Sequence, residues 1–166
     1  TLEQLAAQSE RKFRITRTRY DKTPPRAEMI ELAVPLRPWW NTGTKINFSD
    51  KGDVGEDGAT ECIQFVVQVA AHARFTRTGD DLRMRLDISL KDSLCGLHTT
   101  VTDVFGRPVS VKLSVVNPRE SLVLPGHGMP KKGRPDARGA LFIDFYVKYP
   151  TYGLTPAQVA TLREIL

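Results

Sequence analysis

The segment from Val123 to Phe145 contains the residues that most resemble a reactive site. It places Gly126-His127-Gly128 between two apolar runs, which suits a phosphate loop, a catalytic histidine on a tight turn, or a simple turn. A dinucleotide loop needs a helix after it, whereas an apolar strand is expected here. The corresponding stretch of the first half of the chain has Lys51 in place of the histidine. We therefore interpret the glycines as a turn that requires positive φ.

The other side chains that suit metal binding are dispersed along the chain. His72, His98 and His127 show no metal-ligand spacing, and Cys62 and Cys95 form no CxxC pair. Two cysteines of this kind cannot complete a structural zinc site. We therefore expect no metal, no zinc and no cofactor.

Nucleophilic and acid–base catalysis have equally little support. Ser93 lacks the glycine elbow that exposes a catalytic serine, and Asp80-Asp81 is interpreted as a turn into a strand. We therefore expect no catalytic residue and no enzymatic activity.

Composition limits the classes of partner. The 166 residues are 40% hydrophobic and carry a net charge of +5, so the chain has enough apolar side chains for a core and a moderately basic surface. The charge suits an acidic peptide or nucleic acid, but the basic run 131–138 lacks the interleaved aromatics of a nucleic-acid surface and is interpreted as a solvated loop. No apolar run is long enough to cross a membrane.

These residues must be positioned by a mostly β fold. Short runs with alternating or β-branched residues, separated by turn residues, predict a sandwich or barrel. The expected strands are Lys12–Thr18, Met29–Leu36, Thr44–Ser49, Glu61–Val69, Leu82–Leu90, Thr99–Val104, Val109–Val115, Leu122–Leu124 and Ala140–Lys148. Short helical turns are expected at Leu2–Ala7 and Leu90–Leu94, and a helix capped by Thr155 closes the chain.

The chain also looks internally duplicated. TLEQL at 1–5 resembles SLKDS at 89–93, and GATECIQFVVQV at 58–69 resembles GALFIDFYVKYP at 139–150. We predict two similar tandem β-sandwich domains, at 1–77 and 78–150, and a short C-terminal helix at 151–166. The first repeat lacks a counterpart of Leu82–Leu90, so we expect it to be truncated at its start.

Four motifs, in order along the chain, resemble the C-terminal substrate-binding region of DnaJ-type, forty-kilodalton heat-shock co-chaperones. They are FTRTGDDL at 75–82, Gly96 after a helical turn, GHGMP at 126–130 and LTPAQ at 154–158. No CxxCxGxG repeat interrupts the 17–28 loop, which resembles the zinc-free subclass. No His-Pro-Asp motif of a J-domain occurs in these residues. The resemblance implies two β-sandwich domains and a dimerising helix.

The resemblance also implies a binding site on the first domain. Positions matching Arg11, Phe13, Ile15 and Phe75 would line a shallow groove for unfolded clients. Arg11, Lys12 and Arg14 would bind the acidic C-terminal tail of the seventy-kilodalton heat-shock chaperone, to which clients are delivered. From the residues alone, the alternation of Phe13 and Ile15 also fits an ordinary half-buried strand.

The C-terminal helix presents an apolar stripe, for which we expect a homodimer interface formed by Val159, Leu162, Ile165 and Leu166. The alternative is that this helix folds back on its own second domain. We expect a cytoplasmic protein without nucleic-acid or membrane partners. The alternative function is a basic β-rich nucleic-acid-binding module.

Overall fold

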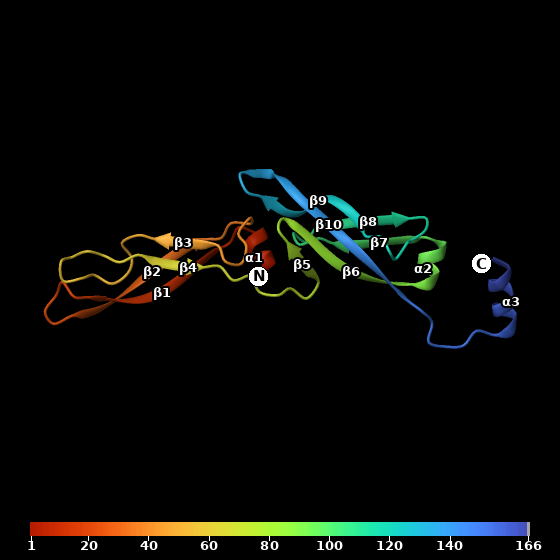
Figure 1. The fold of residues 1–166 in the computed structure, drawn as a ribbon, viewed down its shortest axis with the longest axis horizontal. Helices are drawn as coiled ribbons and strands as arrows, with labels where there is room; N and C mark the ends of the chain where they lie inside the picture. The colour runs from red at the N-terminus through yellow and green to blue at the C-terminus, as the bar shows by residue number, and fades with distance from the viewer. Residues whose placement is uncertain (166) are drawn as a thin grey trace.

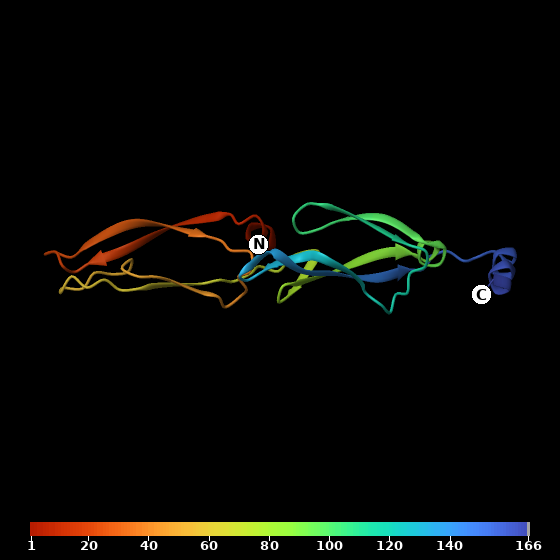
Figure 2. The same cartoon turned by 90° about the horizontal axis from the view of Figure 1, so that it is seen from above.

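The computed structural model describes residues 1–165, except for the side chain of Pro135. The molecule is elongated, with two groups of strands that follow one another along its long axis and a helix beyond them (Figures 1 and 2). This confirms an all-β fold with a few short helices. The elements are α1 (Leu2–Ala6), β1 (Glu10–Arg19), β2 (Arg26–Pro35), β3 (Lys45–Phe48), β4 (Ile63–Val66), β5 (Phe75–Thr78), β6 (Asp81–Ser89), α2 (Leu90–Cys95), β7 (Leu97–Thr102), β8 (Pro108–Leu113), β9 (Leu122–Lys131), β10 (Arg134–Lys148) and α3 (Pro156–Ile165).

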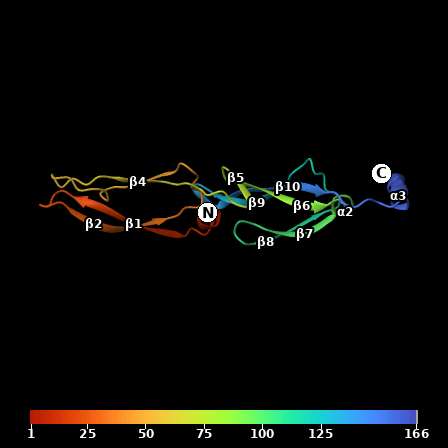
Figure 3. The same ribbon diagram turned by 90° about the horizontal axis from the view of Figure 1, so that it is seen from below.

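The first group consists of two antiparallel hairpins, β1–β2 and β3–β4, that form two layers (Figure 3). Alternation on β2 buries Leu32 and Val34 between the layers. At the far end, the 53–54 segment continues along β1: the Thr18 amide donates to the Asp53 carboxylate at 2.7 Å, and the Tyr20 amide donates to the Val54 carbonyl at 2.8 Å. The layers are therefore joined at that end.

The second group is a four-stranded sheet in the order β5-β6-β10-β9, covered on one face by the β7–β8 hairpin (Figure 3). Strands β6 and β10 pair in parallel, with Leu141 opposite Leu82 and Ile143 opposite Met84. The inward side chains of these strands, including Leu141 and Ile143, are fully buried. The largest continuous core of the described residues lies here.

The expected duplication is visible in the order of the elements. Helices α1 and α2 both begin with a capping box, formed by Thr1 with Gln4 and by Ser89 with Asp92. Each is followed by a hairpin and then by an antiparallel strand pair, β3–β4 or β9–β10. Among residues 1–165, no strand pairs with the outer edge of β4, where β10 has β6. The proposed domain limits at 77 and 150 stay a prediction.

The two groups meet at a junction that includes α1. Leu2 and Leu5 of α1 are buried in the same core cluster as Phe75, and Trp40 packs against it. His72 lies between the groups: its Nδ1 accepts hydrogen bonds from the Arg74 and Phe75 amides, and its Nε2 contacts the Glu3 carboxylate. Residues that precede β1 and residues that follow β4 therefore both contribute to the junction.

Helix α3 begins where expected, because the Thr155 hydroxyl accepts a hydrogen bond from the Gln158 amide. Figure 1 shows it beyond the end of β10, joined by an extended segment. None of its described side chains is buried; Leu162 is 36% exposed and Ile165 is 72% exposed. Leu166 lies outside the described residues. Across residues 1–165, no helix has the length and hydropathy needed to span a membrane.

Candidate binding groove

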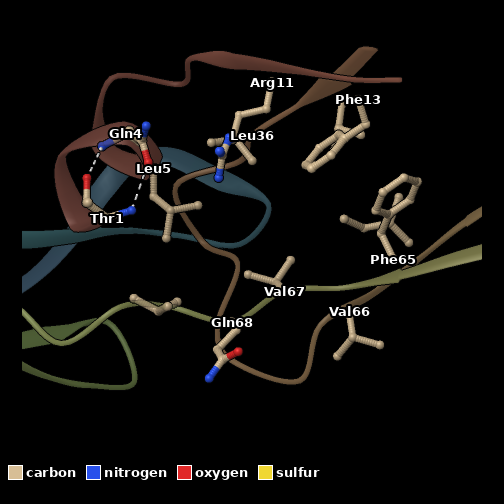
Figure 4. A pocket seen from close by; sticks show the side chains of 13 residues that line it. Thr1, Gln4, Leu5, Arg11, Phe13, Leu36, Phe65, Val66, Val67 and Gln68 are labelled. Atoms are coloured by element: carbon tan, nitrogen blue, oxygen red, sulfur yellow. Dashed lines mark hydrogen bonds between the residues drawn. The ribbon is translucent and has the colours of Figure 1, made fainter. Parts of the chain in front are cut away.

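An open apolar groove lies in the first group of strands, between α1, the β1–β2 hairpin and the segment that contains β4 (Figure 4). It has a volume of about 250 Å³. Small-molecule pockets usually exceed about 300 Å³. A groove of this size instead suits one or two side chains of an extended peptide. Its lining is Thr1, Gln4, Leu5, Arg11, Phe13, Val34, Leu36, Ile46 and the run 65–69.

Alternation brings the aromatic side chains of the groove together. Phe13 on β1 faces inward opposite Leu32 of β2, and Phe65 on β4 faces inward from the other layer. Their ring centroids are 5.0 Å apart, and Figure 4 shows the two rings on facing sides of the groove. Phe48 stands edge-on to Phe65 at 5.5 Å. These contacts fix the orientation of the Phe65 ring.

Phe65 is the residue that sequence reasoning missed. Ile63, Phe65 and Val67 alternate as half-buried positions on the expected strand, and this pattern marks them as facing one side. Alternation on β4 does not reveal which residue of β1 lies opposite, because that depends on how the two hairpins stack.

Arg11 is the charged member of the groove. Its side chain is exposed, and its guanidinium carbon lies 5.6 Å from the centroid of the Phe13 ring. Within the part of the chain that the structure describes, no carboxylate pairs with it. The groove thus combines apolar walls with one cation at its rim.

Three other predicted residues lie elsewhere on the first group of strands. Lys12 and Arg14 project from the opposite face of β1, where their side-chain nitrogens lie 3.5 and 3.7 Å from the Glu31 carboxylate. Ile15 shares the inward face with Phe13 but stands one step farther along β1, opposite Ile30, and does not line the groove.

The structure does not bring Phe75 to the groove. Phe75 is 5% exposed, belongs to the core of the junction and lies 5.1 Å, between centroids, from the His72 ring. It lines a separate cavity with Leu2 and Arg77. The family resemblance implied a place for Phe75 in the groove, but β5 directs its side chain into the core. Burial lowers the pKa of the neighbouring Arg77, and Asp80 opposes that shift.

The glycine–histidine segment has a structural role that differs from the expected turn. Residues 126–129 lie inside β9 as a bulge, with Gly126 at φ 78°. Gly128 and Gly139 pack against the Asp80 carbonyl, where a Cβ atom would clash, and that carbonyl accepts a hydrogen bond from Met129. The glycines allow this close approach of three backbone segments.

The remaining candidates for chemistry are also engaged in the fold or scattered. The Asp81 carboxylate accepts a hydrogen bond from the Ala140 amide at 2.7 Å, which fixes the start of β6 against β10. Cys62 and Cys95 are exposed free thiols. Among residues 1–165, no three histidine, cysteine or acidic side chains gather as metal ligands would.

Comparisons with known proteins place the whole β region in one family. Residues 1–150 match the family described as the DnaJ C terminal domain. Protein psi1 of Schizosaccharomyces pombe is 38% identical over 161 residues, which cover 95% of this chain and 42% of that protein. Protein SIS1 of Saccharomyces cerevisiae is 35% identical over 167 residues, covering 99% and 46%. DnaJ homolog subfamily B member 5 of Homo sapiens is 32% identical, covering 100% and 48%. The chain spans less than half the length of these relatives.

Proposed function

The chain belongs to the DnaJ C-terminal domain family of heat-shock co-chaperones, in the zinc-free subclass, and from this premise we propose that its groove binds unfolded client polypeptides. The observation that carries the proposal is the facing pair Phe13 and Phe65 in an open apolar groove. Unfolded chains expose the apolar side chains that such a groove would remove from water.

Backbone pairing supplies a second contribution to client binding. Strand β2 pairs only with β1 among the described residues, so its outer edge offers unpaired amide and carbonyl groups. An extended peptide adds to such an edge through its main chain, while pockets nearby select its side chains. This combination gives affinity with little sequence specificity, as a binder of varied clients requires.

We also propose that Arg11 binds the acidic C-terminal tail of the seventy-kilodalton heat-shock chaperone. It stands at the rim of the groove without a carboxylate partner among the described residues, so its guanidinium is available to an incoming carboxylate. Lys12 and Arg14 share Glu31 on the other face and would contribute long-range attraction only. We further propose that the protein acts in the cytoplasm as a homodimer with domains at 1–77 and 78–150. This homodimer would transfer clients to that chaperone.

The test is suppression of aggregation of a chemically unfolded client at physiological salt. Phe65→Ser removes one wall of the groove and should weaken suppression severalfold while circular dichroism is unchanged. Met29→Ser is the control, because Met29 is 70% exposed on the outer face of the β1–β2 hairpin, in the same group of strands but away from the groove. Equal suppression by both variants and the unmodified protein would place client binding elsewhere.

A further inference from the structure

A cluster of cationic side chains surrounds the tip of the β9–β10 hairpin, far along the chain from the groove. Lys131, Lys132 and Arg134 form the tip itself and are all exposed. Lys131 pairs with Arg134, and Pro130 pairs with Arg138, so Arg138 lies directly below the tip.

Arg138 lies between two register shifts of the β9–β10 pairing and beside an aromatic ring. The pairing of β9 and β10 shifts between Arg134 and Arg138, and again between Arg138 and Ala140. The guanidinium carbon of Arg138 lies 4.1 Å from the centroid of the Phe105 ring, and that of Arg107 lies 5.1 Å from it. The fold therefore gathers two guanidinium groups around Phe105, which is distant in sequence from the basic run.

A buried carboxylate anchors one side of this cluster. Asp103 has a fully buried side chain, which accepts hydrogen bonds from the Arg107 and Phe105 amides and from the Arg107 guanidinium at 2.8 Å. The His127 ring approaches it at 3.3 Å. Burial opposes ionisation of Asp103, but these hydrogen bonds outweigh it and lower its pKa. The Asp103 carboxylate forms an ion pair with Arg107, so it does not neutralise the cations of the tip.

The tip cations consequently lack partners within the described part of the chain. No carboxylate there lies within ion-pairing distance of Lys131, Lys132, Arg134 or Arg138. One guanidinium nitrogen of Arg138 is buried and makes no hydrogen bond. Asp136 is the single acidic residue in the run 131–138. Like charges held this close repel one another, and an anionic ligand relieves that repulsion.

We propose that the β9–β10 tip, defined as Lys131, Lys132, Arg134 and Arg138, is a docking surface for an acidic segment of a polypeptide. Flexible lysines at the tip suit successive carboxylates on an extended chain, and guanidinium groups bind carboxylates through paired hydrogen bonds. Nucleic acid is the weaker fit: bases need a free aromatic face, and the one aromatic ring that the described contacts place beside Arg138 already stacks with two guanidiniums. The surface is independent of the groove.

The test measures binding of a fluorescently labelled oligoglutamate peptide to the whole chain by anisotropy, at about 50 mM and about 200 mM salt. The triple variant K131Q/K132Q/R134Q should bind the peptide about tenfold more weakly at the lower salt. The control K91Q/K112Q/R119Q removes the same charge from exposed positions of the second group of strands and should stay within about twofold.

Three outcomes would overturn the proposal. The peptide does not bind the unmodified protein, or the two triple variants lose the same affinity, or an oligonucleotide of equal charge binds the tip more tightly than the peptide does. Circular dichroism of both triple variants checks that the exposed substitutions leave the fold unchanged.

Discussion

Arg11 differs from Lys12 and Arg14 in the face of β1 that it occupies, although the three are neighbours in sequence. Arg11 lines the groove, whereas Arg14 lies 3.7 Å from the Glu31 carboxylate on the outer face. Of these three cationic side chains, only Arg11 is placed to form hydrogen bonds with a ligand in the groove. The same change of charge should therefore have different effects at the two positions.

We predict that Arg11→Glu weakens binding of an acidic-tailed peptide by about tenfold, because it replaces a charge-assisted hydrogen bond with repulsion. Arg14→Glu changes the net charge equally and should weaken binding by about twofold or less, through long-range attraction alone. Isothermal titration of both variants with the same peptide measures the difference. Equal losses would mean that the tail senses net charge rather than Arg11.

Asp103 is predicted to carry a pH-dependent part of the stability. Its pKa is held below the ordinary value of 3.8, so its contribution is fully present above about pH 4 and is lost as the pH falls through the lowered pKa. Asp103→Asn should cost about 2–4 kcal/mol of unfolding free energy at neutral pH. Urea unfolding of both proteins should show this difference shrinking as the pH falls below 4; a constant difference would exclude the ionised Asp103 as its cause.

The groove could be predicted from the sequence only in part. Alternation on β1 predicted that Phe13 faces inward with Ile15, and in the structure Phe13 lines the groove. It could not tell that Phe75 turns into the junction core, or that Phe65 takes a place in the groove, because both depend on how separate sheets stack. The Arg138–Phe105 contact was equally hidden, since it joins separate strand pairs and lies next to irregular pairing of β9 with β10.

The short elements follow local signals closely. The two expected helical turns and the helix capped by Thr155 match α1, α2 and α3 to within a residue or two, because the hydrogen bonds that cap each helix are made inside a single turn. Strand ends were predicted less well: the strand expected at Leu122–Leu124 runs to Lys131, since pairing with β10 carries β9 across its glycine bulge. Pairing partners, rather than local propensity, decide where these strands end.

The end of α1 carries a strained residue that its repeat avoids. Gln8 has φ 51°, while Gly96, at the corresponding position after α2, has φ 105°. A side chain in the left-handed region costs about 1 kcal/mol, so Gln8→Gly should raise the unfolding free energy by roughly that amount. Ala7→Gly is the control, because Ala7 is at φ −77° and should lose about 0.5–1 kcal/mol. Thermal unfolding that ranks the two variants in the opposite order would contradict this account.

At the scale of the whole molecule, α3 is the helix that buries none of its side chains among residues 1–165. Leu162 and Ile165 are exposed at the far end of an elongated chain, and a helix of this length is marginal in water without packing. Burial of Val159, Leu162 and Ile165 against a second copy would contribute about 1.5–3 kcal/mol for each side chain before ordering costs. The homodimer proposed above would satisfy this requirement.

We predict that light scattering finds a dimer whose fraction rises with concentration, and that a chain ending at Tyr149 is monomeric. Ile165→Asp should shift the equilibrium toward monomer, because it places a charge in the apolar stripe. Ala160→Asp, on another side of the helix, should do so less. If the whole chain stays monomeric at tens of micromolar, on the order of the concentration at which a weak dimer forms, then α3 is not a dimer interface.

The position of α1 in the junction has a consequence for synthesis of the protein. Leu2 and Leu5 are translated before Phe75 and strand β6, with which they share their core cluster, and these leave the ribosome only after the whole first group of strands. A nascent chain halted at Val69 would therefore hold two uncovered leucines, and α1 should be open to proteases until β5 and β6 emerge. The first group of strands would therefore depend on protection for part of its own translation.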